Sequence, residues 1–284
     1  MRKVALITDT DSSLPPQIAE QYGIRQVPIT IHFDQESYTT GLDIDDARVF
    51  QLVDQKNKLP TTSAPSPHAF STAFETAFLE GADAILCICV SSKVSATYSA
   101  ALAACENFPG RDISVLDSLN LSMGQGFMVV AAAEALRAGA SKVQASVAAM
   151  ETGQNTRVFA VLSTLKYLAM SGRVGKLVAG MADTLNIKPL LTIQEGKLDM
   201  LERIRTRKKA IDRMLDLTRQ SIDGKTIKRA AVIHVTDPQG ASDLEQQLRA
   251  ALPCPEEIIT TEFTPGLSVH TGSGVVGLAV VTGR

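Results

Sequence analysis

The chain has 284 residues, of which 45% are hydrophobic and 20% are charged, a balance that permits a sizeable core and excludes disorder, collagen and coiled coil. Its 28 Lys and Arg against 30 Asp and Glu leave a formal net charge of −2. The chain therefore lacks the overall positive charge that would indicate binding to nucleic acid or to an anionic membrane. With 4 Tyr, 9 Phe and no Trp, the chain also lacks the aromatic residues of a base-stacking platform.

The cysteines and apolar runs bear on compartment and metal binding. Cys87, Cys89, Cys105 and Cys254 fit no zinc spacing. The apolar run before Asp9 is too short for a secretory signal, and the longest apolar runs fall far below the ~20 residues of a membrane span. We expect a cytoplasmic protein with reduced thiols, no metal, no nucleic-acid partner and at most transient membrane contact.

Strands and helices are predicted to alternate through the first half, which indicates a parallel sheet with helical crossovers. Three prolines at 60–67 predict a loop there. The predicted strands cover residues 4–8, 25–33, 84–90 and 113–116, and the predicted helices cover 16–22, 45–56, 68–79, 97–107 and 126–138.

The second half has a different pattern, in which a hairpin is expected over 189–194 and 197–204 around the Glu195-Gly196 turn. Fewer crossovers indicate a separate α+β domain with a mixed or antiparallel sheet. We therefore predict two domains, residues 1–155 and 156–284. Further strands are expected at 158–162, 230–235, 257–263 and 275–281, and further helices at 164–170, 210–221 and 242–252.

Hydroxyl-rich loops follow the predicted strands at 9–13, 61–66, 91–97 and 117–122. Because carboxyl ends of parallel strands meet at one edge of a sheet, these loops are expected to converge there. Hydroxyls and free backbone N–H groups together can hold an anion without a metal. Each hydroxyl, taken alone, is more simply explained as a helix cap or a turn residue, and it is the set of four loops that favours an anion site.

An ordered set of motifs resembles the DegV family of fatty-acid-binding proteins. Each motif alone is weak, but together they span nearly the whole chain in the family's order. They are TSAPS at 62–66, SSKVSATYSA at 91–100, DS at 117–118, YL at 167–168 with SGRVG at 171–175, NIKPLL at 186–191 and HTGSG at 270–274.

The resemblance implies a two-domain α/β protein that binds one long-chain, palmitate-like fatty acid in a buried apolar tunnel and uses no cofactor. It implies a lipid carrier rather than an enzyme. In several members the protein is the acyl-carrying subunit of a bacterial fatty-acid kinase, so the resemblance also implies a separate kinase that phosphorylates the carboxylate.

The resemblance also implies site residues. The hydroxyls of Thr62 and Ser95 match the carboxylate-binding groups of the family, and the N–H groups of Ala96 and Thr97 are expected to assist. The family usually has Gly at position 96, so Ala96 would be strained if this position required a positive φ; it also usually has Pro where this chain has Ser273. Expected in the head-group vicinity are Ser63, Arg173 and His270.

The energetics of such a site are favourable. Each buried methylene contributes roughly 0.8 kcal/mol, so a long acyl chain gains on the order of 10 kcal/mol before ordering costs. An unpaired buried carboxylate would cancel much of that gain, and hydroxyls, N–H groups and a nearby cation would offset the loss.

A basic run follows the predicted hairpin and includes Arg203, Arg205 and Arg207. Its simplest interpretation is a solvated face. The alternative is a docking patch for an acidic partner, such as a kinase subunit.

An enzyme hypothesis competes with the carrier. The apolar run that ends in Asp9-Thr10-Asp11 resembles the aspartate pair of Mg-dependent haloacid-dehalogenase-type phosphatases, in which one Asp is the nucleophile and the other the acid/base. The later acidic pair of such enzymes has no suitably placed counterpart here. The G-x-G-x-x-G, Walker A and G-x-S-x-G patterns are also missing from the sequence.

Overall fold

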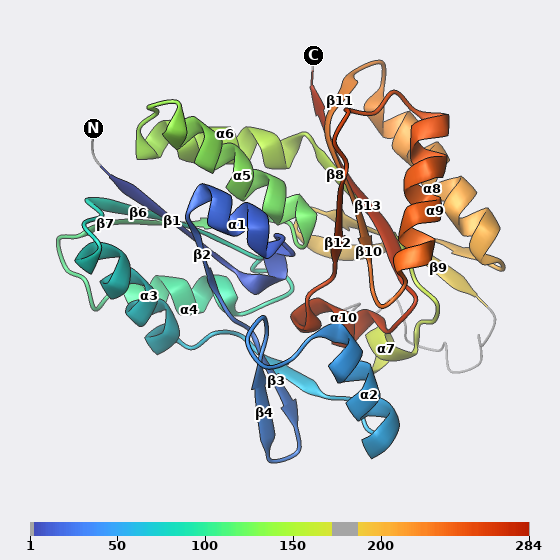
Figure 1. Ribbon diagram of the computed structural model, residues 1–284, viewed down its shortest axis with the longest axis horizontal. Coiled ribbons are helices and arrows are strands. Elements are labelled where there is room, and N and C mark those ends of the chain that lie inside the picture. The colour runs from blue at the N-terminus through green and yellow to red at the C-terminus, as the bar shows by residue number, and fades with distance from the viewer. Residues whose placement is uncertain (1–2, 172–186, 284) are drawn as a thin grey trace.

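The computed structural model describes residues 3–171 and 187–283, and within them the chain forms three β-sheets (Figure 1). The first sheet has strand order β2-β1-β6-β7 and all of its pairs are parallel. β6 is buried along its whole length, as expected for an apolar strand covered on both faces. The strands are β1 (Val4–Asp9), β2 (Ile24–Val27), β6 (Ala84–Cys89) and β7 (Asp112–Asp117).

Helices cover both faces of this sheet. On one face Leu6 and Leu86 share a core with α5, and on the other Ile7 and Cys87 share a core with α3 and α4. This alternation along β1 and β6 follows from the two-residue repeat of a strand. The helices are α1 (Pro16–Tyr22), α5 (Met123–Arg137) and α6 (Lys142–Gln154) on the first face, and α3 (Pro67–Leu79) and α4 (Thr97–Cys105) on the second.

A small antiparallel sheet with order β4-β3-β5 projects from the first (Figure 1). The prediction of one strand over 25–33 is wrong, because Pro28 has no N–H for a ladder bond and the chain leaves the parallel sheet there. The predicted loop at 60–67 also contains a strand. The elements are β3 (Thr30–Phe33), β4 (Glu36–Thr39), β5 (Thr61–Ser63) and α2 (Asp46–Lys56), which packs on this sheet.

The second half forms a mixed sheet with order β10-β9-β8-β13-β11-β12, in which the β11–β12 pair alone is parallel among the described strands. The predicted fold class is therefore confirmed. The predicted hairpin is also confirmed, with its turn at Glu195-Gly196. The strands are β8 (Thr156–Val161), β9 (Lys188–Gln194), β10 (Lys197–Ile204), β11 (Thr226–His234), β12 (Ile259–Glu262) and β13 (Val276–Gly283).

The two faces of this mixed sheet are covered differently. α8 (Arg207–Ile222) and α9 (Pro238–Ala251) pack on one face, where they share a core with Leu278 of β13. The other face packs against α5, whose neighbours include Ala279 of β13. α5 therefore lies between the two large sheets and joins them in one core. The domain boundary at 155/156 stays a prediction; in the chain, α6 ends and β8 begins there.

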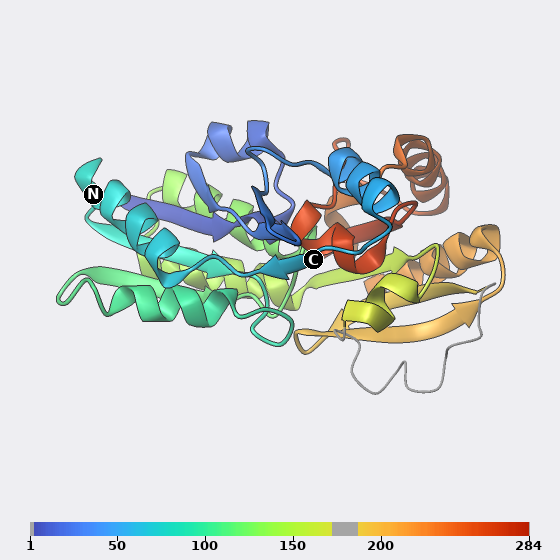
Figure 2. The same cartoon turned by 90° about the horizontal axis from the view of Figure 1, so that it is seen from below.

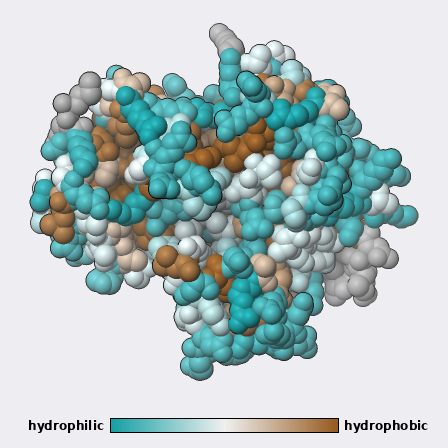
Figure 3. All heavy atoms as spheres, in the orientation of Figure 1, coloured by the Kyte–Doolittle hydropathy of each residue, from teal (hydrophilic) through white to brown (hydrophobic). Residues whose placement is uncertain are grey.

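A short helix, α10 (Pro265–Thr271), lies where the two halves meet. It contacts α7 (Lys166–Ser171), α2 and β5, and Figure 2 shows it between these elements. The surface of Figure 3 is mainly hydrophilic, with an apolar groove between α1, α5 and β12 that is lined by Ile18, Ile259 and the buried Phe127. None of the helices in the described part of the chain is long and apolar enough to cross a membrane.

Candidate functional site

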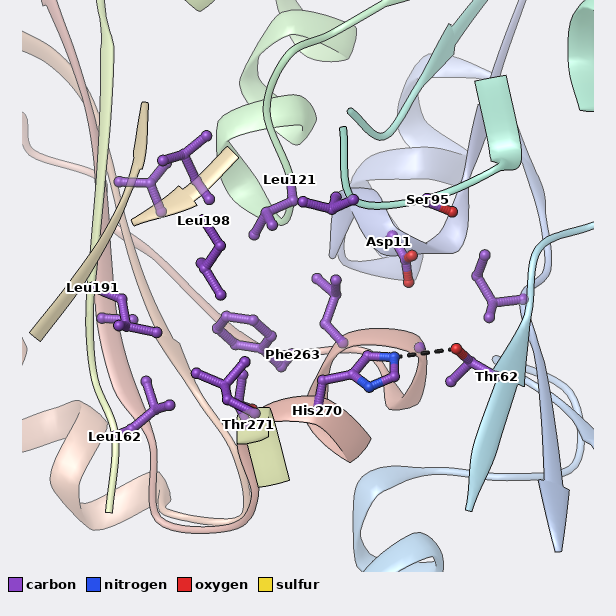
Figure 4. A pocket seen from close by; sticks show the side chains of 18 of the residues that line it. Asp11, Thr62, Ser95, Leu121, Leu162, Leu191, Leu198, Phe263, His270 and Thr271 are labelled. Carbon is purple, nitrogen blue, oxygen red and sulfur yellow. Dashed lines mark hydrogen bonds between the residues drawn. The ribbon is translucent and has the colours of Figure 1, made fainter. Parts of the chain in front are cut away.

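A cavity of about 220 Å³ lies between the carboxyl edge of the parallel sheet and the mixed sheet (Figure 4). A single water needs only ~10–15 Å³ on this scale, so the cavity has room for a much larger guest. Most of its wall is apolar. The apolar lining residues are Ile29, Ala64, Val94, Ala96, Leu121, Val158, Ala160, Leu162, Leu168, Leu191, Ile193, Leu198, Phe263 and Leu267.

Four polar lining residues gather at one end, whereas the hydroxyls of Thr192 and Thr271 donate to the Val158 and Ser268 carbonyls, at 2.8 Å and 3.3 Å. Figure 4 shows Asp11, Thr62, Ser95 and His270 around that end, with leucine side chains such as Leu191 at the other. Such a wall suits a molecule with one polar terminus and a long apolar body.

Thr62 and His270 come from opposite halves of the chain and meet at this end. The Thr62 Oγ1 and His270 Nε2 atoms lie 3.1 Å apart. β5 pairs with β3, with Thr62 opposite Ile31, and the alternation of the strand turns Thr62 inward and Ser63 outward. His270 lies in the last turn of α10, which ends at Thr271 and is capped by Gly272.

Ser95 and Ala96 lie in the loop between β6 and α4, and both line the cavity. The loop is held by a turn in which the Ser95 N–H donates to the Ser91 carbonyl at 3.1 Å. Ala96 precedes the first residue of α4 and has φ −81°, so this position requires no glycine and Ala96 is unstrained. The partial positive charge at the start of α4 favours an anion at this end of the cavity.

Several residues predicted from the sequence lie elsewhere. Ser63 is exposed and its Oγ is 2.8 Å from His32 Nε2, outside the cavity lining. Thr97 is buried but does not line the cavity; its hydroxyl lies 2.8 Å from Ser95 Oγ. Arg173 and most of the SGRVG motif lie outside the described residues.

The three arginines of the basic run are not equivalent. Arg203 and Arg205 are exposed. Arg207 forms an ion pair with Asp237 and donates to the Gly274 carbonyl at 2.7 Å. Its guanidinium therefore anchors the loop after α10.

The sequence interpretation missed Asp11 as a cavity residue. Asp11 is only 4% exposed and lines the polar end, whereas the sequence analysis considered it only as part of a phosphatase motif. The hydroxyl-rich loop at 9–13 was a usable signal, because it follows β1 at the carboxyl edge of the sheet.

The phosphatase alternative is not supported. Asp9, its nucleophile, is fully buried, and its carboxylate accepts N–H bonds from Val90 at 2.8 Å, Asp11 at 3.0 Å and Gln125 Nε2 at 3.1 Å. Burial raises the pKa of Asp9 to about 6. These contacts tie the end of β1 to β6 and α5. Within residues 3–171 and 187–283, no cluster of three or more His, Cys, Asp or Glu side chains could hold a metal ion.

Known proteins resemble this chain over nearly its whole length. Residues 3–283 match a family model described as "Uncharacterised protein, DegV family". A DegV domain-containing protein of Mycobacterium tuberculosis is 35% identical over 283 residues, covering 99% of this chain and 98% of that protein. One of Streptomyces coelicolor is 32% identical over 279 residues, covering 98% of each.

Two solved structures superpose closely. A fatty-acid-binding DegV family protein from Thermus thermophilus has a TM-score of 0.92 at 33% identity, covering 99% of this chain and 100% of that one. DegV of Bacillus subtilis, described as a fatty acid binding protein, has a TM-score of 0.90 at 28% identity, covering 100% of both chains. The family model and the relatives extend over essentially all of this chain, which therefore belongs to the DegV family.

Proposed function

We propose that this protein binds one long-chain fatty acid in the cavity, with the carboxylate between Thr62, Ser95 and His270 and the acyl chain along the leucine-rich end. The observation that carries the proposal is the arrangement of the wall, where four polar side chains gather at one end and most of the remaining lining is apolar. The named function of the Thermus thermophilus and Bacillus subtilis relatives supports it.

The head-group end supplies partners for a carboxylate. The hydroxyls of Thr62 and Ser95 donate to its oxygens, and the N–H groups at the start of α4, including those of Ala96 and Thr97, add a favourable dipole. His270, when protonated, supplies a positive charge. The carboxylate would thus lose its water shell but keep hydrogen bonds, which limits the penalty of burial.

The apolar end supplies the binding free energy. Each methylene removed from water contributes roughly 0.8 kcal/mol. Waters in this part of the cavity would find few hydrogen-bond partners, so an acyl chain replaces them favourably.

The protein is further proposed to present the carboxylate to a separate fatty-acid kinase rather than to act on it. Ala96 is exposed while also lining the cavity, so the head group lies close to the surface, where a second protein can reach it. Arg203 and Arg205 are candidate docking residues because both are exposed. Arg207 is a weaker candidate, since it is held by Asp237.

Lipid extraction tests the binding function. Protein denatured and extracted with organic solvent is expected to release one fatty acid per chain, measured by mass spectrometry. After delipidation, palmitate binding is measured by calorimetry. Ser95→Ala should weaken binding about tenfold with little change in melting temperature, and Ser92→Ala, in the same loop but outside the lining, is the matched control. Absence of both extracted lipid and palmitate binding would refute the function.

The kinase role has a separate test. Palmitate-loaded protein is incubated with a bacterial fatty-acid kinase subunit and ATP, and ADP release is measured. The Arg203→Glu/Arg205→Glu variant should raise the apparent KM for the loaded protein while its palmitate affinity stays unchanged. Equal kinetics for wild type and variant would remove these arginines from docking.

A further inference from the structure

A second carboxyl group lies at the polar end of the cavity. Asp11 is 4% exposed, lines the cavity, and in Figure 4 its carboxyl points into the space bounded by Ser95, Thr62 and His270. A bound fatty acid would bring its own carboxylate to the same place. Two buried carboxylates in contact repel each other strongly, and one of them takes up a proton.

Asp9 and Asp11 form a pair whose members have different hydrogen bonds. The Asp9 carboxylate accepts bonds from two backbone N–H groups and from Gln125. For the Asp11 carboxyl, the bond found within the described residues is a long one from Thr264 Oγ1, at 3.5 Å. Donors stabilise the ionised form, so the negative charge of the pair resides on Asp9 and the proton on Asp11.

The surrounding elements hold Asp11 in position. Gly266 of α10 lies so close that a Cβ atom at this position would be 2.2 Å from Asp11 Oδ1. The Ser122 N–H, at the start of α5, donates to the Asp11 carbonyl at 2.7 Å. The backbone and one oxygen are thus fixed, and the carboxyl is directed toward the cavity.

Within residues 3–171 and 187–283, the charged and titratable groups around Asp11 are few. β1 contributes Asp9, whose charge adds to burial in raising the pKa of Asp11 well above its usual value. α10 contributes His270, which lines the same cavity. α5 contributes the neutral Gln125, and the acidic Asp46 of α2 lies behind Ser268 of α10, to which it is hydrogen-bonded at 2.6 Å.

We propose that Asp11 is a specificity-determining residue of the head-group site, where it holds one proton between its own carboxyl and the carboxyl of the bound fatty acid. This inference rests on the proposed fatty-acid site. The neutral Asp11 donates its O–H to a carboxylate oxygen of the ligand, so the two carboxyls together carry one proton and one negative charge. Where Asp11 is ionised in the free protein, binding takes up that proton from solvent.

This arrangement makes affinity depend on pH in a defined direction. Above the pKa of Asp11 in the free protein, binding must take up a proton, and affinity falls by up to about tenfold per pH unit. His270 is also a titratable side chain and lines the same cavity. The contribution of Asp11 to the pH dependence is therefore the difference in palmitate affinity between the wild type and a variant at position 11, both of which keep His270.

Asp11→Asn provides that comparison, because the amide has nearly the same shape and carries no titratable proton. Palmitate affinity is measured from pH 6 to pH 9. The variant should bind several-fold more weakly than wild type at pH 6, because an amide N–H is a weaker donor than a carboxylic O–H. Its affinity should decline less with pH, so that the two profiles converge or cross toward pH 9. Equal affinities at pH 6 together with parallel profiles would overturn the proposal.

Infrared spectroscopy supplies a direct readout that does not depend on where Asp11 titrates. Complexes with palmitate carrying ¹³C at the carboxyl carbon are recorded at pH 8, so that ligand and protein carbonyl bands are separated. Wild type should show one more protonated carboxyl, on protein or ligand, than Asp11→Asn. Equal numbers would refute the shared proton.

If Asp11→Asn does not fold, the wild type labelled with ¹³C at its aspartate carboxyls gives the same information. Binding of unlabelled palmitate should then shift a protonated aspartate or ligand carboxyl band, and no such band would refute the proposal. Failure of wild type to bind palmitate at any pH would instead refute the proposed function, so the two failures are distinguishable.

Discussion

The Thr62 hydroxyl and the His270 imidazole lie 3.1 Å apart although 208 positions separate them in the chain. Thr62 belongs to β5 of the small sheet, and His270 belongs to α10, which precedes the last strand. The polar end of the cavity is thus assembled from both halves of the chain, and a ligand head group there contacts both.

Replacing Thr62 by Val tests the contribution of its hydroxyl. The change keeps the shape of the side chain but removes the donor to the ligand carboxylate. Hydrogen bonds to charged groups contribute about 1.5–3 kcal/mol, so palmitate affinity measured by calorimetry should fall roughly ten- to a hundredfold. Ser63→Ala, on the outward face of the same strand, is the control and should bind as wild type. Equal losses in both variants would indicate damage to β5 instead of a lost ligand contact.

Filling the cavity at Ala160 should change the preferred chain length. Ala160 lies on β8, opposite Leu191 of β9, and both residues line the cavity. Ala160→Leu adds three carbon atoms, about the room of two to three methylenes of the ligand. Competition among fatty acids of graded length should show a shift toward shorter chains by about that number. The same substitution at the exposed Ala103 of α4 should leave the preferred chain length unchanged. A shift in this control too would contradict the assignment of Ala160 to the wall around the acyl chain.

Asp46 should make stability depend on pH. It is buried at the start of α2, accepts a bond from Ser268 Oγ at 2.6 Å, and its Oδ2 has no hydrogen-bond partner in the described part of the chain. Burial raises its pKa to about 8. The folded state therefore holds this proton more tightly than the unfolded state, and stability is lost as pH rises from about 4 toward 8 and levels off above it.

Asp46→Asn removes this titration. The pH-dependent decrease in the free energy of unfolding that this substitution abolishes is on the order of 5 kcal/mol at most. Above pH 8 the variant should therefore be more stable than wild type in urea unfolding. Asp45→Asn keeps the N-cap and keeps Asp46, so it should retain the wild-type slope. A wild-type slope in Asp46→Asn would contradict this assignment.

Gly272 should tolerate no side chain. It has φ +84°, and a Cβ atom there would lie 2.5 Å from the ring of Tyr167. Gly272→Ala therefore combines about 1–3 kcal/mol of backbone strain, because φ +84° with ψ 172° is a region essentially restricted to glycine, with about 1–3 kcal/mol of overpacking, seen as a lower midpoint in urea unfolding. Gly110 has φ +78° with open space around it, so Gly110→Ala should lose only the backbone part. Equal losses would mean that Tyr167 moves aside freely.

The regular parts of the fold were predictable because their signals are local. β1 and β6 are continuous apolar runs, and the hairpin of β9 and β10 has a Glu-Gly turn between alternating strands. The split at Pro28 and the strand β5 were not predicted, since β5 owes its pairing to β3, some 30 residues earlier in the chain. α6, with a capping box at Ser141, was overlooked although its signal is in the sequence.

The candidate site was only partly predictable. Family motifs pointed to Thr62, Ser95, Ala96 and His270, and the structure places all four in one cavity wall. Asp11 was assigned to the wrong chemistry because the aspartate pattern of β1 also occurs in phosphatases. The apolar wall could not be assigned, because an aliphatic residue that faces a cavity looks in sequence like one that faces the core.

The position of α5 limits how a lipid can enter or leave. Ten of its residues, among them Phe127 and Met128, are buried, and the helix lies between the two large sheets. Moving the two halves apart as rigid bodies would expose this helix to water. The free-energy cost of the lost apolar burial would be far above that of moving a few side chains. A ligand bound in the cavity would therefore exchange through a local opening beside the cavity, while the packing around α5 stays intact.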